Sequence, residues 1–266
     1  MTTKKDNDVD ILVVGDIHLK PGVSNERMTW LGNLVVDKEP EVIVFIGDVF
    51  DMPSLSSFDV GKKSFEGRRL TNDLLSGRDG LGKFKAPIDA YNKVLKAKHI
   101  KQYNPRMHVV IGNHERRLEK AINSDAKLEG TVSMDDYRFE DFGIQVTPFL
   151  DPLIVEGITF QHYFTSGAMD RPMGGENIGK SILKRYHTSC LQGHNHILAL
   201  AHESDAKGKM LIAGSIGCYF SHHEDYLSKQ AQNNFSRGVL MLKNVKDGSV
   251  RDFEFISLDT IKRDYK

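Results

Sequence analysis

Five short apolar runs recur along the chain, and each of them ends in a polar cluster. They are Ile11–Val14 before GDIH, Val42–Ile46 before GDVFD, His108–Ile111 before GNHE, Ile158–Phe160 before QHYF, and Cys190–Leu191 before QGHNH. Apolar runs of this kind, separated by segments with helical spacing, are typical of strands buried on both faces of an α/β sheet. Functional groups in such sheets collect beyond the carboxyl ends of the strands, so we predict that the clusters converge there.

Segments with helical spacing lie between these runs. The predicted helices are Asn25–Val36, Glu115–Leu128, Gly179–Tyr186 and Pro87–Lys101, the last with its proline near the first turn. The glycine-rich stretch SGRDGLGK is predicted to separate this last helix from an earlier helical piece. Residues 52–105 are too long for a simple crossover, and we interpret them as a cap-like insertion in a single domain spanning residues 1–266.

After His196 the pattern changes to strands joined by turns. The strand-like stretches read ILALAHE, KMLIAGSIGCYF and GVLMLKNVKDGSVRDFEFISL. Within the last of them, Lys246–Ser249 has the composition of a hairpin turn. We expect this C-terminal third to build a second sheet packed on the first.

Composition sets limits on the partners of the protein. Lysine plus arginine equal aspartate plus glutamate at 36 each, so a nucleic-acid or membrane partner would need a local patch of charge. The first apolar run is too short for a signal peptide or a membrane span, which predicts a soluble, cytoplasmic protein without membrane association. We expect Cys190 and Cys218 to be buried thiols rather than a disulfide. The oligomeric state is left open by the sequence.

The polar clusters contain side chains that bind metal ions. In an extended segment Asp16 and His18 would point to the same side, as would His194 and His196, because side chains alternate along a strand. The full set offers four nitrogen and three oxygen donors, from Asp16, His18, Asp48, Asn113, His162, His194 and His196. That is too many for one tetrahedral ion, whereas two cations about 3.5–4 Å apart would use the set if one carboxylate bridged them.

The chemistry of these donors narrows the choice of metal. Mixed imidazole, carboxylate and amide ligation suits manganese, iron or zinc better than calcium or magnesium alone. We therefore expect two divalent metal ions, with manganese first and iron, zinc, nickel or magnesium as alternatives. Glycines at positions 15, 47, 112 and 193 lie in the clusters, where tight turns would let the loops approach the ions.

The ordered series GDIH, GDVFD, GNHE, the lone histidine of QHYF, and GHNH resembles the five motifs of the calcineurin-like metallophosphoesterases over about residues 11–197. The resemblance implies a four-layer αββα sandwich of two mixed sheets with a dinuclear centre at the strand ends. It implies a first metal bound by Asp16, His18 and His196. It implies a second bound by Asn113, His162 and His194, with Asp48 bridging the two.

The resemblance also assigns a role to His114. This histidine would bind no metal and would either protonate the leaving alkoxide or stabilise charge on the phosphoryl group. Asp51 and Glu115 are both candidates for the carboxylate that tunes it. Arg116 and Arg117 follow it directly, and one of them could reach a substrate phosphate. The catalytic residues of this interpretation are His114, Asp48 and Asn113.

Three functions are compatible with these residues. The donor set and the basic residues of the insertion, which form either a solvated face or a basic lid, favour a metal-dependent phosphodiesterase acting on a nucleotide or nucleic acid. GNHE and the double arginine favour a phosphomonoesterase for a nucleotide, a metabolite or a Ser/Thr phosphoprotein. The third is an inactive binding module, against which the complete donor set argues.

Overall fold

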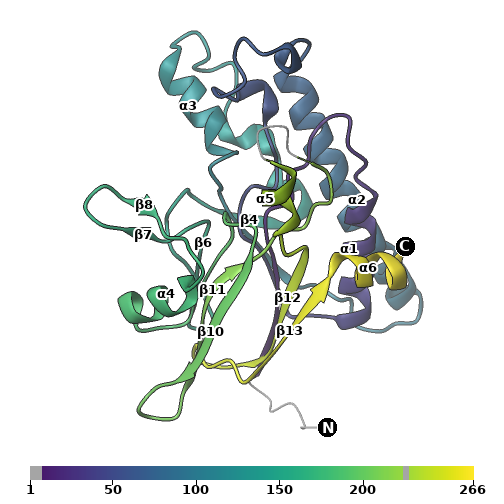
Figure 1. The fold of residues 1–266 in the computed structure, drawn as a ribbon. Coiled ribbons are helices and arrows are strands. Elements are labelled where there is room, and N and C mark those ends of the chain that lie inside the picture. Colours follow the sequence, from purple (N-terminus) through teal and green to yellow (C-terminus); the bar gives the residue numbers. More distant parts are fainter. Residues whose placement is uncertain (1–7, 224–227) are drawn as a thin grey trace.

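Two β-sheets pack face to face in the computed structural model, which describes residues 8–223 and 228–266 (Figure 1). Three hydrophobic clusters fill the spaces between successive layers. One holds Leu12, Val14 and the inner face of the first helices, the second holds Ile11 and Val13 between the sheets, and the third surrounds Ile182. The arrangement is the predicted αββα sandwich, with apolar residues on both faces of the central strands.

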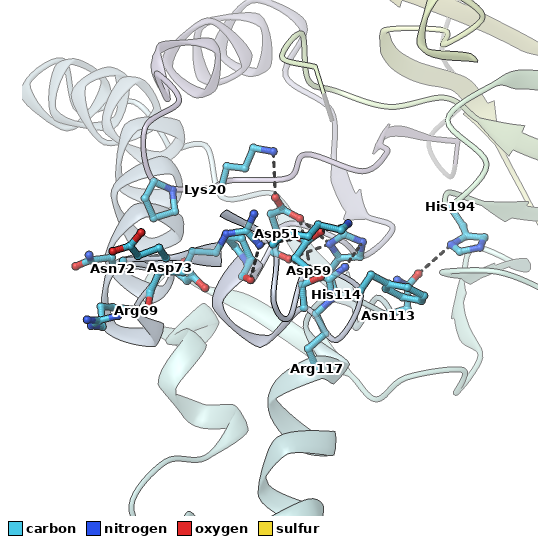
Figure 2. A pocket seen from close by; sticks show the side chains of 18 residues that line it. Lys20, Asp51, Asp59, Arg69, Asn72, Asp73, Asn113, His114, Arg117 and His194 are labelled. Atoms are coloured by element: carbon cyan, nitrogen blue, oxygen red, sulfur yellow. Dashed lines mark hydrogen bonds and ion pairs between the residues drawn. The ribbon is translucent and has the colours of Figure 1, made fainter. Parts of the chain in front are cut away.

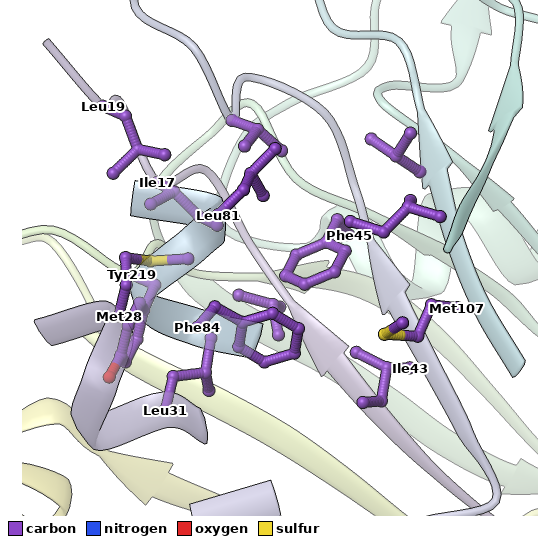
Figure 3. Packing of buried hydrophobic residues seen from close by; sticks show 14 of the residues in the cluster. Ile17, Leu19, Met28, Leu31, Ile43, Phe45, Leu81, Phe84, Met107 and Tyr219 are labelled. Carbon is purple, nitrogen blue, oxygen red and sulfur yellow. The ribbon is translucent and has the colours of Figure 1, made fainter. Parts of the chain in front are cut away.

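The first sheet has six strands in the order β13-β12-β1-β2-β3-β4. Their bounds are β1 Val9–Val14, β2 Val42–Phe45, β3 Arg106–Val110, β4 Ile144–Thr147, β12 Gly238–Val245 and β13 Asp252–Ser257. Strands β1 to β4 are parallel, so the predicted runs in β1, β2 and β3 end at the same edge. The helices on its outer side are α1 Glu26–Lys38, α2 Leu70–Ala97 and α6 Leu258–Tyr265. Figure 3 shows Leu31 of α1 and Phe84 of α2 packed with Phe45 of β2.

The second sheet has five strands in the order β10-β11-β9-β6-β5. Their bounds are β5 Leu153–Val155, β6 Ile158–Gln161, β9 Cys190–Gln192, β10 Leu198–Ser204 and β11 Met210–Ile216. Helix α4, Ile178–Tyr186, covers this sheet. The smaller elements are β7 Thr165–Ser166, β8 Arg171–Pro172, α3 Arg116–Ser124, α5 Lys229–Asn233, and the 3-10 helices η1 Pro53–Leu55, η2 Lys63–Phe65, η3 Met134–Tyr137 and η4 Phe139–Phe142.

The C-terminal third differs from the prediction, because it does not build a sheet of its own. Strand β12 pairs antiparallel with the free edge of β1, and β13 follows it, so both join the first sheet. Strands β10 and β11 extend the second sheet from β9. The predicted hairpin is confirmed: Asp247 and Gly248 have φ of 48° and 74°, the left-handed pair that a tight turn between twisted strands requires.

Helix α2 also differs from the prediction, because it runs without a break through SGRDGLGK and contains Pro87 in its interior. The glycines serve close packing rather than turns. A Cβ on Gly77 would overlap with the Phe50 ring, and one on Gly80 would lie 2.6 Å from the Leu19 side chain. Helix α2 thereby packs against the loops that follow β1 and β2. The cap-like role of residues 52–105 stays a prediction.

The remaining expectations concern the thiols and the membrane. Cys190 and Cys218 are both free and buried, as predicted. Within residues 8–223 and 228–266, no helix combines the length and the apolar character that crossing a bilayer requires.

We predict that Gly77→Ala destabilises the protein by about 1–3 kcal/mol, because the new methyl group must displace the buried Phe50 ring. Gly82→Ala in the same helix is the matched control. Among the described residues its Cβ would come within 4 Å of the Phe142 ring alone, at 3.9 Å, so alanine should raise stability by up to about 1 kcal/mol through helix propensity. Urea unfolding of both variants measures the difference, and equal stabilities would contradict the packing role of Gly77.

Candidate metal centre

The five polar clusters meet where β1, β2, β3, β6 and β9 end. Backbone hydrogen bonds tie their loops together. The N–H groups of Ile17 and His18 donate to the Asp48 carbonyl at 3.0 and 2.9 Å, and Gly193 N–H donates to the His162 carbonyl at 3.1 Å. The loop positions are therefore fixed by main-chain contacts before any side chain is considered.

One group of donors contains Asp16, His18 and His196, whose candidate ligand atoms lie within 4.8 Å of one another. All three residues are buried. The Asp16 Oδ2 atom lies 2.9 Å from His196 Nε2 and 3.9 Å from His18 Nε2. A single cation could contact all three side chains.

A second group contains Asp48, His162 and His194, again within 4.8 Å of one another. Asn113 joins it, because its Oδ1 atom lies 2.8 Å from His162 Nε2 and 2.9 Å from His194 Nδ1. Asp48 Oδ2 lies 3.4 Å from His162 Nε2 and 3.8 Å from His18 Nε2. Asp48 therefore stands between the two groups, and the structure brings all the predicted donors together.

The local backbone that aims these donors is not extended, contrary to the prediction from strand alternation. Left-handed φ values occur at His18 (51°), Asp48 (49°), His194 (65°) and His196 (58°). As a result His194 and His196 enter different groups instead of reaching one point. Non-glycine residues in this conformation cost about 1–3 kcal/mol each and cluster at functional sites. The loops hold that strain through the backbone hydrogen bonds between them.

The glycines of the clusters permit the close approach that the sequence predicts. A Cβ on Gly112 would overlap with the Asp48 carboxylate, and a Cβ on Gly193 would overlap with the Asp16 carboxylate. Gly47 has a φ of 75°, and a Cβ there would lie 2.7 Å from His162 Nδ1. A larger side chain at any of these positions would displace a candidate ligand.

Charge at the centre is balanced between buried acids and imidazoles. Burial opposes ionisation of Asp16, but His196 and His18 hold the pKa of Asp16 well below 3.8. Burial likewise opposes the charge on His162, yet Asp48 raises the pKa of His162 to about 9. Burial and the neighbouring His162 lower the pKa of His194 to about 4. Divalent cations fit this set, because they would supply the positive charge that protons supply on the imidazoles.

Asp51, and not Glu115, contacts the His114 ring. Asp51 Oδ1 lies 2.8 Å from His114 Nδ1. The buried Glu115 carboxylate instead accepts hydrogen bonds from the N–H groups of Asp48 (3.0 Å), Phe50 (2.7 Å) and Gly112 (2.9 Å). Burial, reinforced by Asp48, raises the pKa of Glu115 to about 7. Glu115 thus clamps two cluster loops together, while Asp51 orients the imidazole.

The two arginines occupy different places. Arg117 donates to the Asp51 carbonyl at 2.8 Å and lies 3.1 Å from His114 Nε2, so it borders the candidate centre. Arg116 lies over the Phe149 ring at 4.5 Å. Sequence reasoning missed a further cation, Lys20, whose Nζ lies 3.3 Å from Asp51 Oδ2. Its place two residues after His18 of the first motif was the available signal.

Two adjoining cavities open at the centre. The smaller one, of about 280 Å³, is lined by Asp48, Asn113, His114, His194, Asn195, His196 and Phe235. The larger one, of about 770 Å³, shares Asn113, His114 and His194 with it and extends along residues 53–73 (Figure 2). Of the basic residues in the insertion, Lys62, Arg68 and Arg69 line this larger cavity, whereas Lys83 and Lys85 pair with aspartates along α2.

The sequence profile of the calcineurin-like phosphoesterases matches residues 9–209, which include all five motifs. Among solved structures, the phosphoesterase Yfce from E. coli matches with 13% identity and a TM-score of 0.37, covering 93% of this chain and 100% of that chain. No curated protein sequence matches this chain.

We predict that manganese raises the thermal unfolding midpoint of the metal-free protein. A concentration 100 times the dissociation constant should add about 2.7 kcal/mol for each site. Asp48→Ala should lose most of this gain, because Asp48 stands between both donor groups. Asp252→Ala, which removes an exposed carboxylate at the start of β13, is the control and should keep the gain. Equal shifts in both variants would exclude Asp48 from metal binding.

Proposed function

The chain belongs to the calcineurin-like phosphoesterases, hydrolases that act on phosphoester bonds, and from this premise we propose that its substrate is a phosphodiester of a nucleotide or nucleic acid. The family membership confirms the resemblance drawn from the five motifs. The observation that carries the proposal is the cavity of about 770 Å³ that opens beside His114 and Asn113.

The size of this cavity favours a diester over a monoester. A diester carries an organic group on each side of phosphorus, so its site needs space on both sides of the metal-binding residues. The larger cavity lies in the range of about 300–1,000 Å³ typical of ligand sites, and it continues from the smaller cavity at Asp48 and His196. A monoester carries one organic group, so it would fill only one of the two adjoining cavities.

We propose that Asp16, His18 and His196 hold one divalent cation and that Asn113, His162 and His194 hold another, with Asp48 between them. Manganese is the proposed metal, because imidazole and oxygen donors are mixed. Such a cation pair supplies hydroxide near neutral pH and neutralises phosphoryl charge when bound. The protein's part is to fix the donors, which the inter-loop hydrogen bonds do.

His114 is the proposed proton donor to the leaving alkoxide. The alcohol that corresponds to the alkoxide has a high pKa, so the group leaves more readily when it is protonated. A nearby imidazolium can supply that proton. Asp51 at 2.8 Å from Nδ1 fixes the orientation of the ring. Arg117 donates to Nε2 at 3.1 Å. Nε2 can take up a proton once the guanidinium turns to a phosphoryl oxygen of the substrate, and it then carries the proton that the alkoxide receives.

The position of Arg117 also favours a second candidate function. A guanidinium beside His114 could hold the terminal oxygens of a phosphomonoester in a bidentate contact. A phosphomonoesterase is therefore the alternative that the substrate experiment must separate from the diesterase.

We predict that His114→Asn lowers kcat for 5′-phosphorylated diadenylate, whose leaving group is an alkoxide, by about 10²–10⁴-fold in manganese, because the proton donor is lost. Metal content, measured by atomic absorption, should stay close to that of the unchanged protein. His99→Asn, at an exposed position after α2, is the control and should keep full activity.

Two results would contradict this account. Equal turnover in the His114 and His99 variants would remove the proposed role of His114. A strong preference of the unchanged protein for p-nitrophenyl phosphate over bis(p-nitrophenyl) phosphate would replace the diesterase by the monoesterase.

A further inference from the structure

An exposed aromatic side chain lines the larger cavity. Phe58 is 81% exposed, and it belongs to none of the three hydrophobic clusters formed by the described residues. An aromatic ring left in water at the wall of a cavity offers a flat apolar surface to a ligand. Nucleobases stack on such rings regardless of their sequence. Val60, in the same segment, is also exposed but does not line the cavity.

One basic side chain that lines the cavity, Arg69, has no carboxylate partner among the described residues. Lys62 and Arg68 are both paired with Asp59 at 2.8 Å. Arg69 donates to the Arg68 carbonyl at 2.8 Å, and no acidic side chain among residues 8–223 and 228–266 forms an ion pair with it. Its guanidinium can therefore take a bidentate contact from a phosphate.

The position of Arg69 sets the length of the ligand. Figure 2 shows Arg69 and Asn72 at one end of the row of lining side chains and His194 at the other, with Asp51 and His114 between them. A phosphate held by Arg69 is thus a different phosphate from the one at the candidate metal centre. The ligand must span the cavity between the two.

Acidic side chains along the same walls limit the total negative charge. Asp59, Glu66 and Asp73 line the cavity together with the basic residues. A long polyanion tracks along grooves whose charge is positive throughout, which this mixed wall is not. One nucleoside with a single further phosphate matches it better.

We infer that the cavity along residues 53–73 binds the nucleoside attached to the scissile phosphate, with its base on Phe58 and its next phosphate on Arg69. The inference rests on the proposed function and names the recognition elements of that substrate. A dinucleotide and the end of a single strand share this chemistry, so the experiment includes both.

The test compares two pairs of variants in the same segment. Phe58→Ala removes the stacking surface, and Val60→Ala is its exposed apolar control. Arg69→Gln removes the unpaired charge, and Lys63→Gln is its control, because Lys63 is exposed and does not line the cavity. All four are made in the manganese-loaded His114→Asn protein for binding and in the active protein for kinetics.

Binding is measured by fluorescence anisotropy with diadenylate and tetra-adenylate DNA, each carrying a 5′-phosphate and a 3′-fluorescein label. Phe58→Ala and Arg69→Gln should each raise the dissociation constant at least about fivefold, whereas both controls stay within about twofold. The same two variants should lower kcat/KM for 5′-phosphorylated diadenylate relative to kcat/KM for bis(p-nitrophenyl) phosphate. If each variant loses as much affinity for diadenylate as for tetra-adenylate DNA, the recognised unit is the nucleoside and phosphate that the two probes share.

The outcomes separate this inference from the proposed function. Dissociation constants that match the controls in both variants would overturn the inference, even if the protein hydrolyses diesters. If Arg69→Gln weakens the binding of a labelled phosphoserine peptide and Phe58→Ala does not, the inference is overturned in favour of a protein substrate. A protein that hydrolyses no diester contradicts the proposed function, and the binding measurements still decide the inference.

Discussion

Buried negative charge at one point is the constraint on which the rest of the structure depends. Asp16, Asp48 and Asp51 are all buried where the strands end. Ionised carboxylates in such surroundings need compensating positive charge and hydrogen bonds. Without metal, imidazoles carry that charge: burial disfavours it, but Asp16 and Asp51 raise the pKa of His18 well above 6.5. Bound cations would take over this role and release the protons.

The fold supplies the framework that brings these charges together. Parallel strands β1, β2 and β3 end at one edge of the first sheet, and the parallel pair β6 and β9 ends beside them in the second. Glu115 joins the loops after β2 and β3 by accepting three backbone N–H groups. Strained left-handed residues then turn individual donors inward, which pleated strands could not do.

Local patterns predict the strands and the donors but not their long-range packing. The apolar runs before GDIH, GDVFD and GNHE identify three buried strands, because side chains on both faces are apolar. The glycines of SGRDGLGK predict a break in the helix when the sequence is considered alone. In the structure they make room for Phe50 and Leu19, which are distant in sequence, so local patterns could not reveal their packing role. Asp51 and Glu115 could not be ranked, because only their contacts in the folded protein distinguish them. Strand β12 joins the first sheet because the edge of β1 is free to pair with it, and no local sequence pattern indicates that free edge.

The most direct test is anomalous diffraction from crystals of the protein grown with manganese. The account predicts two peaks, one among Asp16, His18 and His196 and the other among Asn113, His162 and His194, with the Asp48 carboxylate contacting both. A single peak on one side of Asp48, or ions bound elsewhere while these side chains pair only with one another, would contradict it.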